Sequence, residues 1–230
     1  LLAEALREDH IYVTGNTVID ALHLVAEKLD HDARLRSTVR DLLLPEVGFD
    51  PEERPFILVT GHRRESFGQG FRNICAALSR IAEQYPDYEL VYPVHLNPNV
   101  KGPVTKILAG LKNVHLISPL DYEPFVYLMR ESKLILTDSG GIQEEAPSLG
   151  KPVIVMRETT ERPEAVEAGT VRLVGTDAET ICNETERLLE DSTAYEDMSR
   201  AHNPYGDGHA SERIVETLVR SLCASEVTAT

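Results

Sequence analysis

The pattern of apolar and polar residues predicts strands and helices that alternate from Phe56 to Glu190. Short, continuous apolar runs predict strands, and apolar residues that recur every three or four positions predict helices. The predicted strands are 56–60, 90–94, 114–117, 134–137, 153–156 and 171–174. The predicted helices between them are 71–84, 100–111, 124–130 and 177–190. Because the strands are uniformly apolar, both faces of the sheet should be covered, which indicates an α/β fold with a Rossmann-like, doubly wound parallel sheet.

The segments on either side of this pattern are less regular. Residues 11–13 predict a short strand, and residues 18–29 predict a helix that Thr17 caps. Residues 31–53 are polar and partly helical, with loop-forming proline and glycine toward their end. Residues 212–222 predict a final helix.

These patterns suggest three segments. We expect residues 1–54 to hold the end of a preceding domain and an interdomain connector. Residues 55–205 should form the Rossmann-like domain, and residues 206–230 a C-terminal helix. The chain begins at Leu1, not Met, in what resembles mid-element sequence. This indicates either a trimmed terminus or part of a longer protein.

Composition narrows the class of protein. The 230 residues carry a net charge of −15, with a pI near 4.9. Such a surface repels nucleic acids and anionic membranes, so we expect neither as a partner. No apolar run approaches the ~20 residues of a membrane span, and no signal-peptide pattern opens the chain. An anionic ligand would therefore need a local basic pocket.

The cysteines and histidines argue against disulfides and metals. Cys75, Cys182 and Cys223 are odd in number and far apart. They predict reduced, buried thiols in a cytosolic protein. The eight histidines form no His-Glu-x-x-His pattern, so we predict no metal site.

The strongest candidate for chemistry follows the strand 134–137. Ser139, Gly140 and Gly141 lead from this strand into a helical segment. The glycines let the backbone approach a ligand, and the first helical N–H groups favour an anion. Glu144 and Glu145 could then accept hydrogen bonds from sugar hydroxyls. The alternative is an ordinary turn between a strand and a helix whose first turn is acidic.

Three better-known motifs do not match this turn. No Gly-Lys-Ser/Thr follows, as a P-loop requires, and two adjacent glycines are not the Gly-x-Gly-x-x-Gly dinucleotide fingerprint. The run Asp138-Ser139-Gly140-Gly141 resembles the nucleophile loop of trypsin-like proteases. Those proteins are disulfide-bearing β-barrels, so we reject that reading.

Ligands of such sheets bind at the carboxyl ends of the strands. Four polar loops should meet there: 62–65, 95–98, 139–141 and 157–162. His62 could bind a phosphate or transfer a proton, and Arg63 and Arg64 suit bidentate phosphate contacts. A structural histidine and surface ion pairs with Glu65 remain the alternatives.

Three other polar stretches have simpler alternatives. The charged turn 157–164 could hold Arg162, or Glu161 and Glu164, over a ligand, or it could be a solvated loop. His95 could bind a ligand or simply shape its turn. Residues 203–208 have the composition of a tight turn, which we interpret as structural.

Several long motifs together carry a family resemblance. They are Gly-His-Arg-Arg-Glu at 61–65, Pro-Val-His at 93–95, Thr-Asp-Ser-Gly-Gly-Ile-Gln-Glu-Glu-Ala at 137–146, Thr-Thr-Glu-Arg-Pro-Glu at 159–164 and Asn-Pro-Tyr-Gly-Asp-Gly at 203–208. In this order they resemble the bacterial, non-hydrolysing UDP-N-acetylglucosamine 2-epimerases, over residues 11–218. That family has a GT-B fold, of which residues 55–205 would be the C-terminal, UDP-binding domain.

The resemblance implies roles for the glycine turn and its neighbours. Ser139, Gly140 and Gly141 would hold the diphosphate of UDP at the helix N-terminus. Glu145 would bind the ribose hydroxyls, and Phe125 would lie beside the uracil.

Further roles follow from the same resemblance. His62, as a catalytic residue, and Arg162 would contact the phosphates or lie near the reacting sugar. Leu120 stands where some relatives have glutamine, so a contact there would use the backbone. Arg63 and His95 match positions that bind a second UDP-GlcNAc as an allosteric activator.

The implied reaction interconverts UDP-GlcNAc and UDP-ManNAc. UDP is eliminated across C1 and C2 to leave a 2-acetamidoglucal, and then re-adds with a proton delivered to the other face of C2. The family's essential acid/base carboxylates lie in an N-terminal domain that these residues do not include. No metal or nicotinamide cofactor is implied. The resemblance also implies a cytoplasmic homodimer that supplies ManNAc for surface polysaccharide. A GT-B glycosyltransferase and a non-catalytic UDP-sugar-binding module remain alternatives.

Overall fold

The computed structural model describes residues 6–227, with side chains as far as Leu222, and its contacts divide the chain into two units. The larger unit is Val25–Pro204, and the smaller unit combines Leu1–Leu24 with Tyr205–Thr230. The predicted domain boundaries at residues 54 and 205 stay a prediction.

The larger unit is built on one six-stranded sheet. Its strands are β1 (Phe56–Thr60), β2 (Glu89–Pro93), β3 (Val114–Ile117), β4 (Leu134–Thr137), β5 (Val153–Val155) and β6 (Val171–Leu173). Every neighbouring pair is parallel, in the order β3-β2-β1-β4-β5-β6. The predicted α/β fold with a doubly wound parallel sheet is thereby confirmed.

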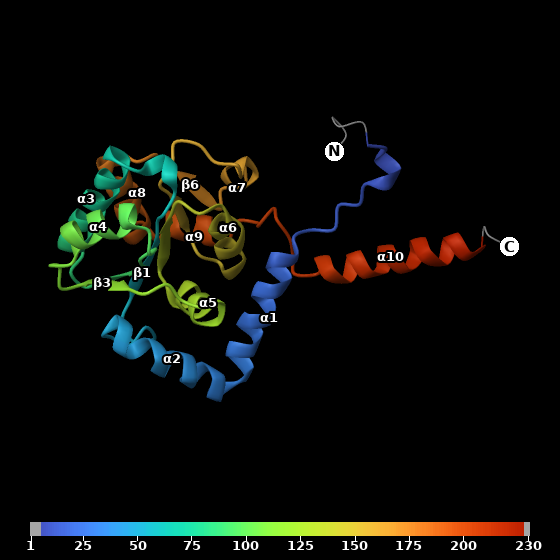
Figure 1. Cartoon of the computed structure of the whole chain (residues 1–230), viewed down its shortest axis with the longest axis horizontal. Helices are drawn as coiled ribbons and strands as arrows, with labels where there is room; N and C mark the ends of the chain where they lie inside the picture. Colours follow the sequence, from blue (N-terminus) through green and yellow to red (C-terminus); the bar gives the residue numbers. More distant parts are fainter. Residues whose placement is uncertain (1–5, 228–230) are drawn as a thin grey trace. The chain divides into compact units, whose positions relative to one another are not determined.

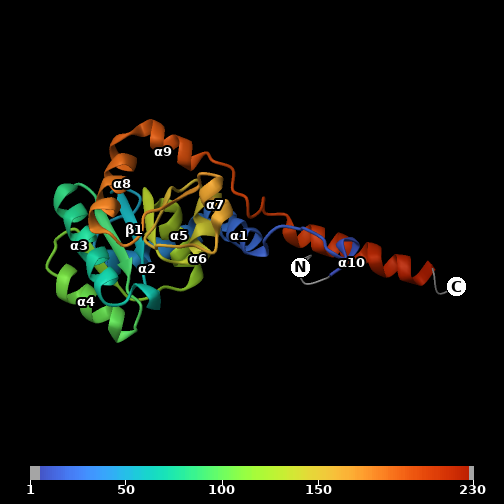
Figure 2. The ribbon, with the colours of Figure 1, turned by 90° about the horizontal axis from the view of Figure 1, so that it is seen from above.

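Helices cover both faces of the sheet, which explains why its strands are mainly apolar. One face carries α3 (Gln69–Gln84), α4 (Pro98–Leu108) and α8 (Ala178–Glu190), and the other carries α2 (Ala33–Val47), α5 (Tyr122–Glu131) and α6 (Gly140–Glu145) (Figures 1 and 2). The chain crosses between faces when α5 leads from the edge strand β3 to the central strand β4. The strand order therefore reverses between β1 and β4, where ligands of such sheets bind.

Shorter elements complete this unit. They are α7 (Pro163–Glu167), α9 (Ser192–Ser199), η3 (Arg64–Ser66) and η4 (Ala146–Leu149). The sequence pattern did not predict α9, which Asp191 caps by accepting hydrogen bonds from the N–H groups of Thr193 and Ala194. Cys75 and Cys182 are buried and free, as predicted, whereas the side chain of Cys223 lies outside the described residues.

The smaller unit contains the start of α1 (Thr17–His31), the turn η2 (Glu8–His10) and α10 (Ala210–Val227). The predicted strand at residues 11–13 is wrong: these residues have no regular structure, and the Val13 side chain is 94% exposed. The predicted cap of α1 also needs correction, since Asn16 Oδ1 accepts a hydrogen bond from the Val18 N–H and Thr17 is already helical. Within residues 6–227, no helix is long and apolar enough to cross a membrane.

Candidate functional site

The glycine turn after β4 is surrounded by charged side chains. Gly140 and Gly141 begin α6, directly after Ser139. A Cβ atom at Gly140 would lie 3.4 Å from Arg63 Nη2 and 4.0 Å from Arg162 Nη2. Two guanidinium groups therefore face the first turn of α6, where helical N–H groups also favour an anion.

Asp138 joins this turn to the loop that follows β1. Its side chain is fully buried, and its Oδ2 accepts hydrogen bonds of 2.8 Å from the backbone N–H groups of His62 and Arg63. Burial raises the pKa of Asp138, against the lowering effect of the Arg63 and His62 hydrogen bonds and of the nearby His62 charge. The carboxylate thus holds the β1 loop against the β4 turn.

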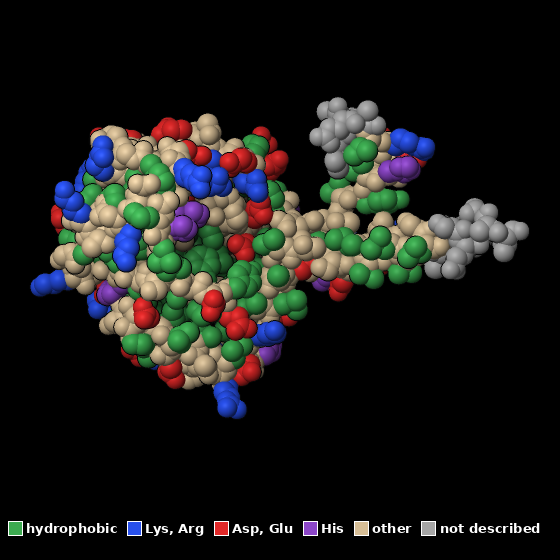
Figure 3. Space-filling model, viewed as in Figure 1, with side chains coloured by type: hydrophobic (Ala, Val, Ile, Leu, Met, Phe, Trp, Pro, Cys, Tyr) green, Lys and Arg blue, Asp and Glu red, His purple; other side chains and the backbone are tan. Residues whose placement is uncertain are grey.

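His62 and His95 lie together beyond the carboxyl ends of β1 and β2. Their rings stack with centroids 5.2 Å apart and planes 14° apart. Both line an open cleft of about 390 Å³, whose other walls are Arg63, Arg64, Glu65 and Asn97. The expected local basic pocket is therefore present in an otherwise acidic chain. Figure 3 shows basic, acidic and histidine side chains close together on one face of the larger unit.

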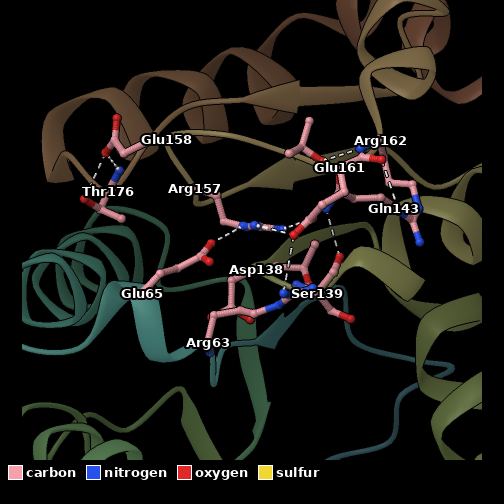
Figure 4. Close-up of polar contacts among 12 residues, drawn as sticks. Arg63, Glu65, Asp138, Ser139, Gln143, Arg157, Glu158, Glu161, Arg162 and Thr176 are labelled. Atoms are coloured by element: carbon pink, nitrogen blue, oxygen red, sulfur yellow. Dashed lines mark hydrogen bonds and ion pairs between the residues drawn. The ribbon is translucent and has the colours of Figure 1, made fainter. Parts of the chain in front are cut away.

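Arg157 connects the β1 loop to the loop after β5. Its guanidinium is 3% exposed and lies between Glu65 and Glu161 in Figure 4. Nη1 donates to Glu161 Oε2 at 2.6 Å, and Nε donates to Glu65. These bonds raise the pKa of Arg157, and they lower the pKa of Glu161 to about 2. The turn 157–164 is therefore an ordered loop held by ion pairs, and the guanidinium of Arg157 is not available to a ligand.

Arg162 is held differently. Its side chain is 33% exposed and forms an ion pair with Glu144 of α6. Its backbone N–H donates to Thr160 Oγ1, which in turn donates to Gln143 Oε1 at 2.6 Å. These contacts fix the guanidinium beside the glycine turn while leaving part of it accessible.

Glu145 points back toward the same turn. A Cβ atom at Gly141 would lie 3.7 Å from Glu145 Oε2, and Glu145 Oε1 accepts a hydrogen bond of 2.9 Å from the Tyr122 hydroxyl. Burial raises the pKa of Glu145, as does the Glu144 charge, whereas the Tyr122 hydrogen bond lowers it. One carboxylate oxygen is thus oriented by Tyr122 and the other faces the glycines.

The two remaining predicted residues lie on the neighbouring segment. Leu120 belongs to the loop between β3 and α5, and Phe125 lies in the first part of α5; both are half-buried. Tyr122, between them, contacts Glu145, so this segment runs beside α6. The ligand roles of all ten predicted residues stay predictions, although eight of them gather around the carboxyl ends of β1, β2, β4 and β5.

Sequence reasoning missed three residues that organise the site. Asp138 directly follows the buried strand β4, and Arg157 directly follows the predicted strand 153–156. A polar residue at the end of a buried strand was therefore the signal available in the sequence. Asn203 opens the turn that we interpreted as structural; its Nδ2 donates to the Glu144 carbonyl at 2.8 Å and to Ser148 Oγ at 2.6 Å. Asn203 therefore also supports α6, which carries both glutamates.

The fold and the site at the carboxyl ends of its strands define a class of protein. It is an α/β domain of Rossmann-like strand order, with a basic, glycine-lined site where the strand order reverses. A family model described as UDP-N-acetylglucosamine 2-epimerase matches residues 1–219. The chain belongs to this family, as the resemblance predicted.

Individual relatives agree. A probable UDP-N-acetylglucosamine 2-epimerase of Ralstonia nicotianae is 61% identical over 218 residues, which are 95% of this chain and 57% of that protein. The UDP-N-acetylglucosamine 2-epimerase of Escherichia coli K12 is 60% identical over the same shares. The chain spans little more than half the length of these curated relatives.

Solved structures show the same likeness. The crystal structure of UDP-GlcNAc 2-epimerase from Neisseria meningitidis bound to UDP-GlcNAc has a TM-score of 0.87 and 50% identity, and the match covers 95% of this chain and 58% of that one. A glycosyltransferase involved in lipopolysaccharide biosynthesis has a TM-score of 0.52 at 18% identity, which shows a shared fold and no more.

Proposed function

We propose that this chain forms the UDP-binding part of an isomerase that interconverts UDP-GlcNAc and UDP-ManNAc. The observation that carries the proposal is the first turn of α6, which two guanidinium groups face across Gly140. The same turn has the carboxylate of Glu145 beside Gly141. A nucleoside diphosphate presents an anion and two ribose hydroxyls, which match these two groups.

In the proposed reaction a carboxylate of the preceding domain that the family resemblance implies takes the C2 proton, the C2–H electrons form the C1=C2 double bond, and the C1–O bond breaks so that UDP leaves with its bonding electrons. Arg63 and Arg162, with the N–H groups of α6, would stabilise the negative charge that builds on the departing diphosphate. His62 would donate a hydrogen bond to the same anion or lie beside the sugar. UDP then adds back to C1 of the 2-acetamidoglucal, and a proton adds to the other face of C2.

The contacts with the nucleoside are part of the same proposal. Ser139, Gly140 and Gly141 would receive the diphosphate, Phe125 would lie beside the uracil, and the backbone at Leu120 would contact the base. The proximity of the β3–α5 segment to α6, seen in the Tyr122–Glu145 hydrogen bond, supports placing both ends of one nucleotide there.

Calorimetric titration of UDP into the purified chain tests this site. Glu145→Ala should weaken binding by about 1–3 kcal/mol, because it removes charged hydrogen bonds to the ribose. Glu167→Ala, an exposed glutamate of α7, is the matched control and should leave the affinity unchanged. Equal affinities for all three proteins would remove the ribose role of Glu145.

Isotope exchange tests the chemistry. The 230-residue chain is incubated with UDP-GlcNAc in D2O, and deuterium at C2 is measured by mass spectrometry. The family resemblance puts the acid/base carboxylates in a preceding domain, so we expect UDP binding without exchange, and exchange once that domain is added. Exchange by the chain alone would show that it carries its own acid and base.

Exchange, measured together with sugar transfer to an acceptor, separates the two rivals. A GT-B glycosyltransferase would transfer the sugar to an acceptor with no exchange at C2. A non-catalytic binding module would bind UDP and show no chemistry even with the added domain.

Regulation and assembly extend the proposal. The cleft of about 390 Å³ that Arg63 and His95 line is our candidate for an activating second UDP-GlcNAc. A homodimer, a cytoplasmic location and a role in polysaccharide biosynthesis also stay predictions. Loss of sigmoidal UDP-GlcNAc kinetics in His95→Ala of the active protein would support the activator site, and unchanged kinetics would remove it.

A further inference from the structure

Asp138 has one carboxylate oxygen that the fold does not use. The side chain is fully buried, and Oδ2 alone accepts both backbone hydrogen bonds from His62 and Arg63. Among the residues that the structure describes, no donor is within hydrogen-bonding distance of Oδ1. Buried polar atoms are nearly always hydrogen-bonded, and an unsatisfied one at a functional site requires an explanation.

The nearest candidate partner is the imidazole of His62. Its Nδ1 lies 3.9 Å from Asp138 Oδ1, slightly beyond hydrogen-bonding distance. The ring stacks on His95, and the side chain is 45% exposed in the open cleft. Because the two nitrogens lie on different edges of an imidazole, Nε2 is directed away from Asp138 when Nδ1 faces it.

The loop contacts alone do not require a carboxylate at position 138. One oxygen accepts both N–H groups, and the amide oxygen of asparagine would serve equally well. A carboxylate is costly to bury, and burial raises the pKa of Asp138. What a carboxylate adds, and an amide cannot, is a second acceptor directed at His62.

We propose that Asp138 is a positioning residue that keeps a proton on His62 Nδ1 and stabilises the imidazolium when His62 Nε2–H donates to a phosphate oxygen of a nucleoside diphosphate. The position of the proton on Nδ1 is independent of the proposed function. The identity of the anion as a nucleoside diphosphate rests on the proposed function.

The charged groups around the pair support this arrangement. On the side of the cleft, His62 has Arg63, Arg64, Glu65 and His95 as neighbours. Behind Asp138 lies the buried Tyr92, whose hydroxyl donates to the Gly61 carbonyl at 2.7 Å. Two arginines and Glu65 lie beside His62 on this side, and the Asp138 carboxylate adds a buried negative charge to the cluster.

The first test is the protonation of His62, observed by long-range 1H–15N correlation spectra of the imidazole rings at about pH 8.5, where such rings are ordinarily neutral. In the wild-type chain Nδ1 of His62 should carry the proton. In Asp138→Asn the amide N–H2 should donate to Nδ1, and the proton should move to Nε2. A wild-type ring with its proton on Nε2 would overturn the proposal, whether or not the variant folds.

The second test is a double-mutant cycle on UDP affinity. Asp138→Asn should weaken binding by about tenfold, as expected for one charge-assisted hydrogen bond. In a His62→Gln background the same change should have almost no effect, because Asp138 acts through His62. A tenfold loss in both backgrounds would mean that Asp138 acts on the loop backbone, and would overturn the proposal.

Asp191→Asn is the matched control. Asp191 Oδ1 also accepts two backbone N–H groups, from Thr193 and Ala194, at the start of α9. Its substitution should change neither the His62 spectrum nor UDP affinity. If the wild-type chain bound no UDP, the proposed function would fail, while the His62 spectrum would still decide the proton position.

Discussion

Two buried aspartates, one in each unit, make the same kind of contact with opposite results. Asp20 is 8% exposed and Asp138 is fully buried, and each accepts hydrogen bonds from two consecutive backbone N–H groups. Asp20 uses both oxygens, for Ala210 at 3.1 Å and Ser211 at 2.6 Å. Asp138 uses one oxygen for both of its donors.

The difference appears in the charge that each site favours. Burial acts to raise the pKa of Asp20, but the hydrogen bonds from Ser211 and Ala210 outweigh it and the pKa is lowered. At Asp138 burial dominates and the pKa is raised. A carboxylate that the fold satisfies stabilises the fold, whereas one left half-satisfied retains an acceptor for another group.

The largest expected effect on stability is at Asp20, whose two oxygens are both hydrogen-bonded within the fold. Asp20→Ala should cost about 2 kcal/mol, because Asp20 caps α10 and its loss leaves two N–H groups without acceptors. Amide hydrogen exchange of Ala210 and Ser211 measures this loss directly. Asp20→Asn keeps one acceptor and should cost roughly half as much. Unchanged protection in Asp20→Ala would mean that the cap does not stabilise α10.

The contributions of Asp20 and Asp138 to the free energy of unfolding should both depend on pH, with opposite signs. The pKa of Asp20 is lowered, so its stabilisation is present above the unfolded pKa of about 4 and is lost as pH falls through the folded value. The pKa of Asp138 is raised, so its charge opposes folding above the folded value, and that penalty disappears as pH falls.

Urea unfolding of the wild type and of the two asparagine variants between about pH 3 and pH 7 measures both signs. Asp20→Asn should be less stable than wild type at pH 7, with a difference that shrinks in acid. Asp138→Asn should be at least as stable as wild type at pH 7, with an advantage that shrinks in acid. If the stabilities of the two variants, each relative to wild type, changed with pH in the same direction, the proposed contrast between Asp20 and Asp138 would be wrong.

The same contrast extends to two arginines. Arg157 is satisfied by Glu65 and Glu161, whereas Arg162 pairs with Glu144 and remains one-third exposed. Arg157→Met should cost about 1–2 kcal/mol of stability, less than a fully buried pair would, because both carboxylates are half exposed and regain water. Arg162→Met should mainly weaken UDP binding. Thermal unfolding and calorimetry of both variants check this, and the reverse assignment would contradict it.

The sequence predicted the sheet well, because its signal is local. The strands at residues 56–60, 114–117 and 134–137 match the structure at both ends, since each is a short, mainly apolar run. The run at 11–13 has the same local character but lacks a neighbouring strand among the described residues, so it remains irregular. A strand needs a partner, and a partner is not a local property.

The candidate site was predicted as a set of loops but not as a set of contacts. Parallel topology requires those loops to meet, and they do, through Arg63 near Gly140 and Arg157 between Glu65 and Glu161. That Arg157 would be buried could not be inferred, because its composition is that of a solvated turn. The contacts of Asp20 and Asn203 could not be inferred either, because their partners lie 190 and 59 positions away in the sequence.

The smallest expected effect concerns Glu145, which stands between the two extremes. One of its oxygens accepts the Tyr122 hydroxyl and the other faces Gly141. Tyr122→Phe removes the donor but not the carboxylate, and Tyr122 is 41% exposed, so water replaces part of the hydrogen bond. UDP affinity should fall by about 0.5 kcal/mol at pH 7.

The direction of the pH effect identifies the cause of this loss. The Tyr122 hydrogen bond lowers the pKa of Glu145, so the pKa should rise further in Tyr122→Phe. The variant should then lose UDP affinity at a higher pH than wild type as the solution is acidified, because Glu145 accepts ribose hydrogen bonds best when ionised. Calorimetric titrations between about pH 5 and pH 8 measure the displacement. Coincident pH profiles would mean that the Tyr122 hydroxyl does not act on Glu145, and Glu145 would then belong with Asp138, as a carboxylate that the fold leaves partly unsatisfied.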